Sequence, residues 1–196
     1  EFYQKIFGLE PKRGFGGAIY MSDGDVNIAL IDAKRADQKE GLNHFGFEVE
    51  DVELVYARLR ENYPSINVLK RPSNRPFAGI SCHDPAGNVF DISQEGMENR
   101  TDAYVNADSE QPRHVKHIAL RAVDPVGLRK FYREVFELAE LEKPADDANF
   151  YLTDGRVVFM IMPWNILDYA GTGVERPALD HIGFKVESVE AVRLQL

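Results

Sequence analysis

The stretch LNHFGFEVEDVELVYARL at residues 42–59 decides the fold, because it returns as LDHIGFKVESVEAVRLQL at residues 179–196. Ten of these 18 positions are identical, at an offset of 137 residues. Self-similarity at a fixed spacing indicates a duplicated structural unit. A duplicated unit should give further matches between the two halves of the chain.

Two more segment pairs follow the same order along the chain. FYQKIFGL at 2–9 matches FYREVFEL at 131–138, and YMSDGDVNIALI at 20–31 matches YLTDGRVVFMIM at 151–162. Their offsets, 129 and 131 residues, are slightly smaller than 137. Chance does not readily produce three ordered matches. The chain contains two copies of one domain, which we call copy one and copy two.

Each copy is predicted to consist of two similar βαβββ units. Residues 116–123 alternate in polarity, which indicates a strand, and Asp124-Pro125 is a favoured helix start. Short strands joined by turns such as 22–25 and 84–88 follow the helices. The predicted apolar helix stripes are Leu128, Phe131, Tyr132, Val135 and Phe136; Val52, Val55 and Leu59; and Val189, Val192 and Leu196.

The copies are cut at different places. HVKHIALRAVDPVGLRK, residues 114–130, precedes the second FY, whereas only Glu1 precedes the first. We expect a first domain over residues 1–95 without its opening strand, and a second over 113–196 without its last strands. Residues 96–112 are polar and lack periodicity, so they are predicted to be the linker. The chain is expected to be a fragment, or to lack its ends.

Composition excludes several classes of function. The net charge of −9 argues against nucleic-acid binding, which needs clustered Lys and Arg. No apolar run approaches the roughly 20 residues that span a bilayer. Cys82 is the single cysteine and cannot form an internal disulfide, which favours a cytoplasmic protein.

The His-bearing segments carry a family resemblance. LNHFGFEVEDVE, LDHIGFKVESVE and HVKHIALRAVD resemble the His-bearing strands of the vicinal-oxygen-chelate superfamily, which includes glyoxalases, bleomycin-resistance proteins and extradiol dioxygenases. FYQKIFGLE and FYREVFELAE resemble its first helix, and HDPAGNVFDIS its closing turn and strand. The resemblance covers nearly the whole chain outside the linker. It implies an α+β fold of tandem domains, each with two paired βαβββ modules forming a half-open barrel.

The resemblance also implies a metal site. In metal-dependent members, the first strand of each module supplies one ligand, and a carboxylate on the last strand of the second module completes the set. His117 and His181 match the two first-strand positions of copy two. In copy one, His44 matches the second of these positions and Asp91 matches the carboxylate, although Asp is one carbon shorter than the usual Glu. A lone His is more often a packed or surface residue, but these recur at equivalent positions.

Two imidazoles and a carboxylate with open positions favour Fe(II) or Mn(II), and can also hold Zn(II) or Ni(II). Some glyoxalases add a fourth protein ligand from the last strand of the first module. The matching segments, 26–29 and 157–160, offer no carboxylate. This favours a three-ligand site, at which a substrate chelates the ion through two adjacent oxygens.

Three functions are compatible with this sequence. A metal-dependent dioxygenase with extradiol-type ring cleavage is favoured, acting on a small, aromatic substrate. It needs an acid–base residue; none is assigned, and Tyr151 and Tyr169 are the candidates between His117 and His181. The alternatives are a glyoxalase-like lyase or isomerase, and a metal-free binding protein like the bleomycin-resistance members. A homodimer that pairs modules between chains is a further expectation.

Overall fold

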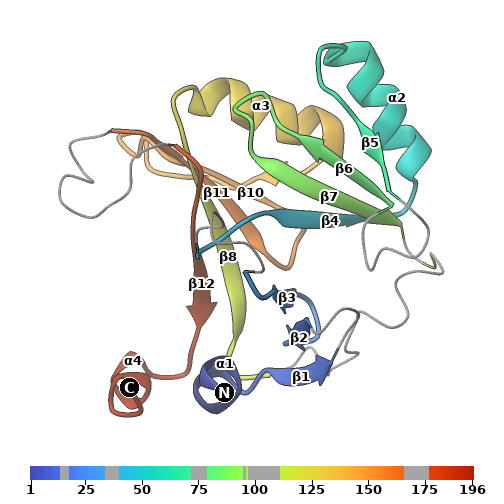
Figure 1. The fold of residues 1–196 in the computed structure, drawn as a ribbon. Helices are drawn as coiled ribbons and strands as arrows, with labels where there is room; N and C mark the ends of the chain where they lie inside the picture. The colour runs from blue at the N-terminus through green and yellow to red at the C-terminus, as the bar shows by residue number, and fades with distance from the viewer. Residues whose placement is uncertain (14–17, 34–39, 72–78, 95, 97–110, 166–176) are drawn as a thin grey trace.

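The structure is a computed structural model, which describes residues 1–13, 18–33, 40–71, 79–94, 96, 111–165 and 177–196. Most of the predicted linker lies outside these residues, as does Tyr169. The described elements form an upper body and a lower body, connected by two long strands (Figure 1).

Copy one contains a helix with three strands, followed by a βαβββ module, in the predicted order. Its elements are α1 (Phe2–Phe7), β1 (Glu10–Arg13), β2 (Ile19–Ser22), β3 (Asn27–Leu30), β4 (Phe45–Val49), α2 (Val52–Asn62), β5 (Leu69–Lys70), β6 (Ile80–His83) and β7 (Val89–Gln94). The segment from β4 to β7 is one full βαβββ module, as predicted from the sequence.

Copy two repeats this order. Its elements are β8 (His114–Ala122), α3 (Pro125–Phe136), β9 (Ala139–Glu140), β10 (Phe150–Thr153), β11 (Val158–Pro163), β12 (Leu179–Lys185) and α4 (Val189–Arg193). The segment from β8 to β11 is a second full module, and β12 with α4 begins the next.

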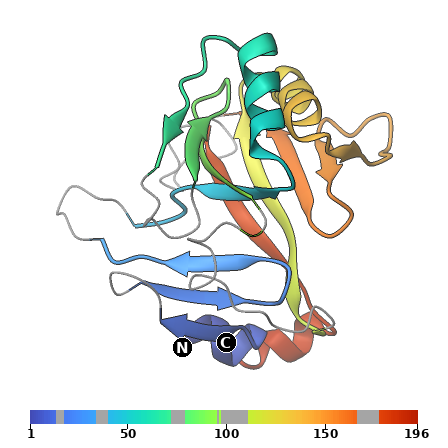
Figure 2. The ribbon, with the colours of Figure 1, turned by 90° about the vertical axis from the view of Figure 1, so that its right-hand side faces the viewer.

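The strand orders show how the modules relate. One sheet has the order β12-β8-β11-β10-β9, so β8 lies between the last strand of its own module and the first strand of the next. Copy one forms two sheets, β1-β2-β3 and β4-β7-β6-β5, in which β3 and β4 are edge strands among the described residues (Figure 2). Within each full module, the first and last strands run parallel, β4 with β7 and β8 with β11.

Side-chain caps begin the helices where the sequence predicts. Asp51 accepts from the backbone N–H groups of Glu53 and Leu54, and Asp124 accepts from that of Gly127. Ser188 accepts from the N–H of Ala191 at the start of α4. Such caps satisfy amide groups that have no partner inside the helix.

The sequence predicts a buried apolar stripe on α4, and this prediction is wrong. Val189 and Leu196 are each 77% exposed, and no residue of α4 is buried. The equivalent helix α2 buries Val55, Tyr56 and Leu59. α2 packs beside β7, whereas the described residues contain no strand in the equivalent place beside α4.

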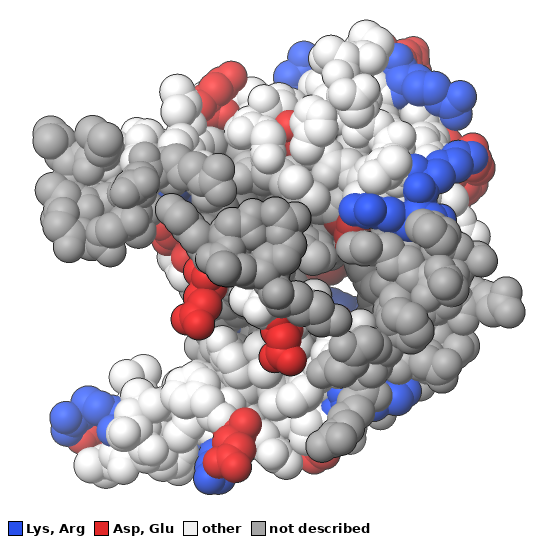
Figure 3. Space-filling model, in the orientation of Figure 1, with Lys and Arg blue, Asp and Glu red and all other residues white. Residues whose placement is uncertain are grey.

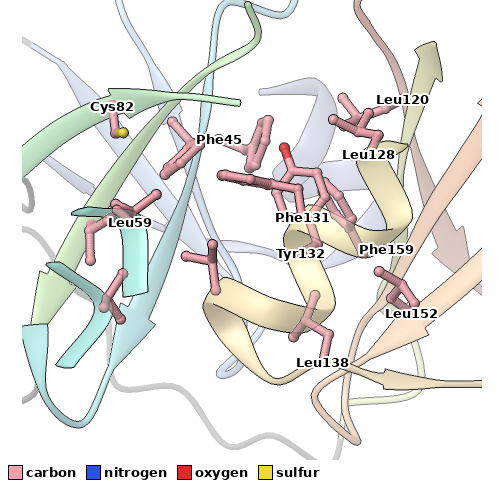
Figure 4. Packing of buried hydrophobic residues seen from close by; sticks show 14 of the residues in the cluster. Phe45, Leu59, Cys82, Leu120, Leu128, Phe131, Tyr132, Leu138, Leu152 and Phe159 are labelled. Atoms are coloured by element: carbon pink, nitrogen blue, oxygen red, sulfur yellow. The ribbon is translucent and has the colours of Figure 1, made fainter. Parts of the chain in front are cut away.

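One hydrophobic core serves both copies. It joins residues of β4, α2, β6 and β7 to residues of β8, α3, β10 and β11 (Figure 4). Tyr132 of α3 lies within it and is fully buried, and its hydroxyl donates to Oδ2 of the buried Asp84 of copy one at 2.7 Å. Asp23 of copy one likewise accepts from the N–H of Val115 of copy two at 2.6 Å. The two copies are thus packed and hydrogen-bonded as one body.

Candidate metal centre

The sheet of copy two has a core face and an opposite face, and the predicted ligands lie on the opposite face. Leu120 of β8 and Phe159 and Ile161 of β11 belong to the shared core. Side chains alternate along a strand, so the residues between them point the other way. Ala119 of β8 is buried but does not belong to the core cluster, so it lies on the second face. His117 is two positions away on the same strand and therefore lies on this face too.

His117 and His181 meet across two antiparallel strands. The register places Gly183 of β12 opposite His117, and His181 opposite Ala119. Because side chains two residues apart share a face, His181 is the diagonal neighbour of His117. Their Nε2 atoms lie 3.0 Å apart and their rings are nearly perpendicular, at 86°.

Gly183 makes this approach of the two rings feasible. A Cβ atom at position 183 would overlap the imidazole of His117, so the ring occupies space that any other residue would fill. The spacing His-x-Gly in β12 therefore has a physical reason. His181 supplies one imidazole, and the glycine two residues later accommodates the other.

The surroundings of His117 favour its neutral form. Burial lowers the pKa of His117, and the neighbouring His181 lowers it further. A neutral imidazole has a free nitrogen lone pair, which is the form that binds metals.

The spacing of the two nitrogens fits binding to one ion. Two imidazole nitrogens held at right angles about 2.0–2.1 Å from an ion lie roughly 2.9 Å from each other. The observed 3.0 Å agrees with this separation. His117 and His181 would thus occupy adjacent positions of an open site, the arrangement that two His ligands have in a two-His, one-carboxylate centre.

Copy one brings its two predicted ligands together on the corresponding face. Phe45 and Phe47 of β4 pack toward the core, and His44 lies immediately before this strand instead of within it. Nε2 of His44 is 3.4 Å from Oδ2 of Asp91, which is 5% exposed on β7. The pair is a histidine with a carboxylate.

The carboxylate of Asp91 already has protein partners. Ser81 is its cross-strand neighbour on β6, and the Ser81 hydroxyl donates to Oδ1 of Asp91. Nε of Arg71 donates to the Ser81 oxygen at 2.7 Å. Hydrogen bonds within the protein therefore satisfy much of this side chain, in contrast to the facing imidazoles of copy two.

The four predicted ligands form two pairs and do not form one cluster. Across the described residues, no group of three or more His, Cys, Asp or Glu side chains could hold a metal ion. Metal binding by each pair stays a prediction.

Sequence reasoning missed the residues that position the ligands. These are Asp180 and Gly183 beside the copy-two pair, and Ser81 beside Asp91. The shared pattern Leu-x-His-x-Gly-Phe contained a signal for the glycine, since Gly46 and Gly183 recur at the same spacing. The role of Ser81 depends on strand register, which no local pattern reveals.

The structure does not bring the suggested acid–base residue Tyr151 to the histidine pair. Tyr151 lies on β10, and β11 and β8 separate that strand from β12. These strand spacings amount to about 10 Å from β10 to β8, which carries His117, and to about 14 Å from β10 to β12, which carries His181. The Tyr151 hydroxyl donates to Asp147 at 2.9 Å, so its partner is a loop residue of its own module.

The surface carries no extended patch of one charge on the face in view. Basic and acidic side chains are interspersed among the described residues there (Figure 3). No helix in the described part of the chain is both long and apolar enough to cross a membrane.

Comparison with known proteins finds a family model that matches the first part of the chain. The model of the Glyoxalase/Bleomycin resistance protein/Dioxygenase superfamily matches residues 1–92, which include His44 and Asp91. The match covers copy one, 92 of the 196 residues, and shows that this part of the chain is similar to the superfamily. The sequence repeat relates copy two to copy one. No curated protein matches the sequence.

Solved structures extend the likeness over both copies. A mutant of 4-hydroxymandelate synthase from Streptomyces coelicolor has a TM-score of 0.69 at 12% identity, and the match covers 99% of this chain and 68% of that one. The 2,3-dioxygenase LapB from Pseudomonas sp. KL28 has a TM-score of 0.65 at 18% identity, covering 99% and 71%. These likenesses confirm the predicted fold of the superfamily.

The chain spans only part of several similar proteins. It covers 34% of a xylose isomerase-like TIM barrel/4-hydroxyphenylpyruvate dioxygenase fusion protein, with a TM-score of 0.62 at 15% identity over 98% of this chain. It covers 65% of the halotolerant catechol dioxygenase BphC, with a TM-score of 0.61 at 15% identity over 96% of this chain.

Proposed function

We propose that the protein is a metal-dependent enzyme of this superfamily whose working site is in copy two, with His117 and His181 as ligands. The observation that carries the proposal is the 3.0 Å separation of the two Nε2 atoms on the face opposite the core. Fe(II) or Mn(II) is the favoured ion, and Zn(II) or Ni(II) is compatible with the same donors. When bound, the ion would hold two adjacent oxygens of a small molecule and act as a Lewis acid.

The residues of the chain have defined parts in this proposal. His117 and His181 hold the ion from adjacent strands, and Gly183 leaves room for the His117 ring. The shared core behind β8 and β11 keeps the strands in register, so the two nitrogens stay at a fixed separation. Preorganised ligands of this kind lower the cost of ordering a site when the ion binds.

Extradiol-type ring cleavage is the reaction we favour. Its support is the absence of a carboxylate from segments 26–29 and 157–160, which leaves coordination positions for substrate and dioxygen. Similar folds also carry ring-cleavage names, among them an extradiol ring-cleaving dioxygenase from B. fuscum with a TM-score of 0.60 at 15% identity, covering 99% of this chain and 54% of that one. The substrate would then be a small aromatic molecule with two neighbouring hydroxyl groups.

Oxygen consumption tests this function directly. The full-length protein is reconstituted anaerobically with Fe(II) or Mn(II) and mixed with a panel of catechols, while dioxygen uptake is followed with an electrode. We expect one dioxygen consumed for each ring opened, and no uptake by His181→Ala. Metal binding without oxygen uptake would favour the glyoxalase-like alternative. No metal binding by the wild type would leave the metal-free binding protein.

A further inference from the structure

The strand that carries His181 has an irregularity directly beside the histidine. Leu179 pairs with Leu120 and His181 pairs with Ala119, so two steps along β12 correspond to one step along β8. Asp180 is the additional residue, and this part of β12 is a bulge. Bulges turn side chains away from strict alternation and are frequent beside active sites.

The bulge lets two consecutive side chains meet. In a regular strand, the residues at 180 and 181 would point to opposite faces. Here Oδ2 of Asp180 lies 2.6 Å from Nδ1 of His181. A carboxylate only accepts hydrogen bonds, so Nδ1 of His181 carries the proton. The lone pair of the neutral ring is then on Nε2, the nitrogen that faces His117.

The other oxygen of Asp180 faces a cation from the neighbouring strand. Nε of Arg121 lies 3.7 Å from Oδ1 of Asp180, and Nη1 of Arg121 donates to the carbonyl of Pro163 at 3.2 Å. Asp180 is mostly buried, with 15% of its side chain exposed. Arg121 thus connects the carboxylate to β8 and β11, the strands that also position His117.

We propose that Asp180, held by Arg121, is a positioning residue that fixes the tautomer and orientation of His181 for metal binding. This inference rests on the proposed metal site. Carboxylates that accept from the second nitrogen of a ligand histidine orient its ring and increase its basicity. Asp180 therefore makes Nε2 of His181 a stronger donor than an imidazole without a charged partner would be.

Copy one contains the same contact with an uncharged partner for the histidine. Oδ1 of Asn43 lies 2.8 Å from Nδ1 of His44, and Asn43 occupies the position of Asp180 in the repeat. The amide oxygen selects the same tautomer without adding negative charge. The Asp180→Asn variant therefore converts the contact in copy two into that of copy one, and separates orientation from charge.

The test combines a readout without metal and one with metal. In the metal-free full-length protein, ring ¹⁵N NMR of labelled histidines identifies which nitrogen of His181 carries the proton. Zn(II) affinity is then measured by competition with a chromophoric chelator. The variants are Asp180→Ala, Asp180→Asn and Arg121→Met, with Asn43→Ala as the matched change in copy one.

We expect a single Nδ1-protonated tautomer of His181 in the wild type and in Asp180→Asn. Asp180→Ala should give a mixture of tautomers and weaken Zn(II) binding by about 10–100-fold, the usual effect of losing such a partner. The Zn(II) affinities of Asp180→Asn and Arg121→Met should lie between those of the wild type and Asp180→Ala. Asn43→Ala should leave the tautomer of His181 unchanged. Unaltered tautomer and affinity in Asp180→Ala would overturn the inference.

Failure of the proposed function would look different. A wild type that binds no Zn(II) would contradict the metal site, whatever the tautomer of His181. Because the tautomer is measured without metal, its dependence on Asp180 would still be decided in that case.

Discussion

The two copies have a histidine at the same position of the sequence repeat and give it different neighbours. In copy one, Nε2 of His44 faces the carboxylate of Asp91 at 3.4 Å. In copy two, Nε2 of His181 faces the imidazole of His117 at 3.0 Å. A histidine and a carboxylate can satisfy each other by sharing a proton. Two imidazoles can likewise share a proton in an N–H···N hydrogen bond, or they can direct both lone pairs at one cation.

The surroundings increase this difference. The Ser81 hydroxyl donates to Asp91, so the copy-one carboxylate has a second donor besides its histidine. In copy two, the carboxylate of Asp180 contacts Nδ1 of His181, so Nε2 stays directed at His117. The same fold thus supports a pair that is satisfied by the protein in copy one and a pair suited to bind an ion in copy two.

The largest expected effect comes from removing the histidine of each copy in turn. His181→Ala should lose the bound metal, because it removes one of two facing donors, whereas His44→Ala should retain it. Elemental analysis of protein purified without chelator measures both, with thermal unfolding as the check on folding. Metal retained by His181→Ala but lost by His44→Ala would reverse the assignment.

Gly183→Ala should separate metal binding from stability. The added Cβ would overlap the ring of His117, which can swing away at small cost because it ends a side chain. We expect Zn(II) affinity to fall by about 10–100-fold, as for lost positioning groups, with little change in unfolding free energy. Gly46→Ala makes the same change in copy one and should leave Zn(II) affinity at the His117–His181 pair unchanged. Equal affinity in Gly183→Ala and wild type would show that the observed ring position is not needed.

Tyr132→Phe should disturb the core that both copies share without altering their difference in metal binding. The fully buried Tyr132 hydroxyl donates to the buried Asp84 across the boundary between the copies. Hydrogen bonds to charged groups contribute about 1.5–3 kcal/mol, so we expect a loss of this size in urea unfolding. Tyr151→Phe removes a hydroxyl from the partly buried Asp147 and should cost less. Two separate unfolding transitions in the wild type would contradict a shared core.

The smallest expected effect is a gain in copy one. Asn43→Asp, made in the His181→Ala background, gives His44 the charged partner that His181 has. Because Asp91 keeps its partner Ser81, we expect Zn(II) affinity at copy one to rise by no more than about 10-fold. A larger gain, measured by the same chelator competition, would show that the partner of Nδ1 alone distinguishes the copies.

The repeat made much of the fold predictable. Matching segments gave two copies, and polarity and capping residues such as Asp51 and Asp124 gave the order of helices and strands. The predicted burial of the α4 stripe was wrong, because a helix face is buried only where another element covers it. Periodicity indicates which side chains can be buried, but the covering element is a tertiary property.

The site was predictable only in its ligand types. Equivalent histidines could be recognised from sequence, and the structure brings His117 to His181 and His44 to Asp91. The role of Asp180 was not predictable, because alternation places neighbouring residues on opposite faces and the bulge that overrides it depends on pairing with β8.

The most direct test of the difference between the copies is a Zn(II) titration of the wild-type protein followed by ring NMR of its histidines. Zn(II) is diamagnetic, so each ring reports its own binding. We predict that the Nε2 resonances of His117 and His181 shift together with the first equivalent of Zn(II), while those of His44 do not. A shift of His44 first, or no shift of His117 and His181, would contradict a metal site in copy two.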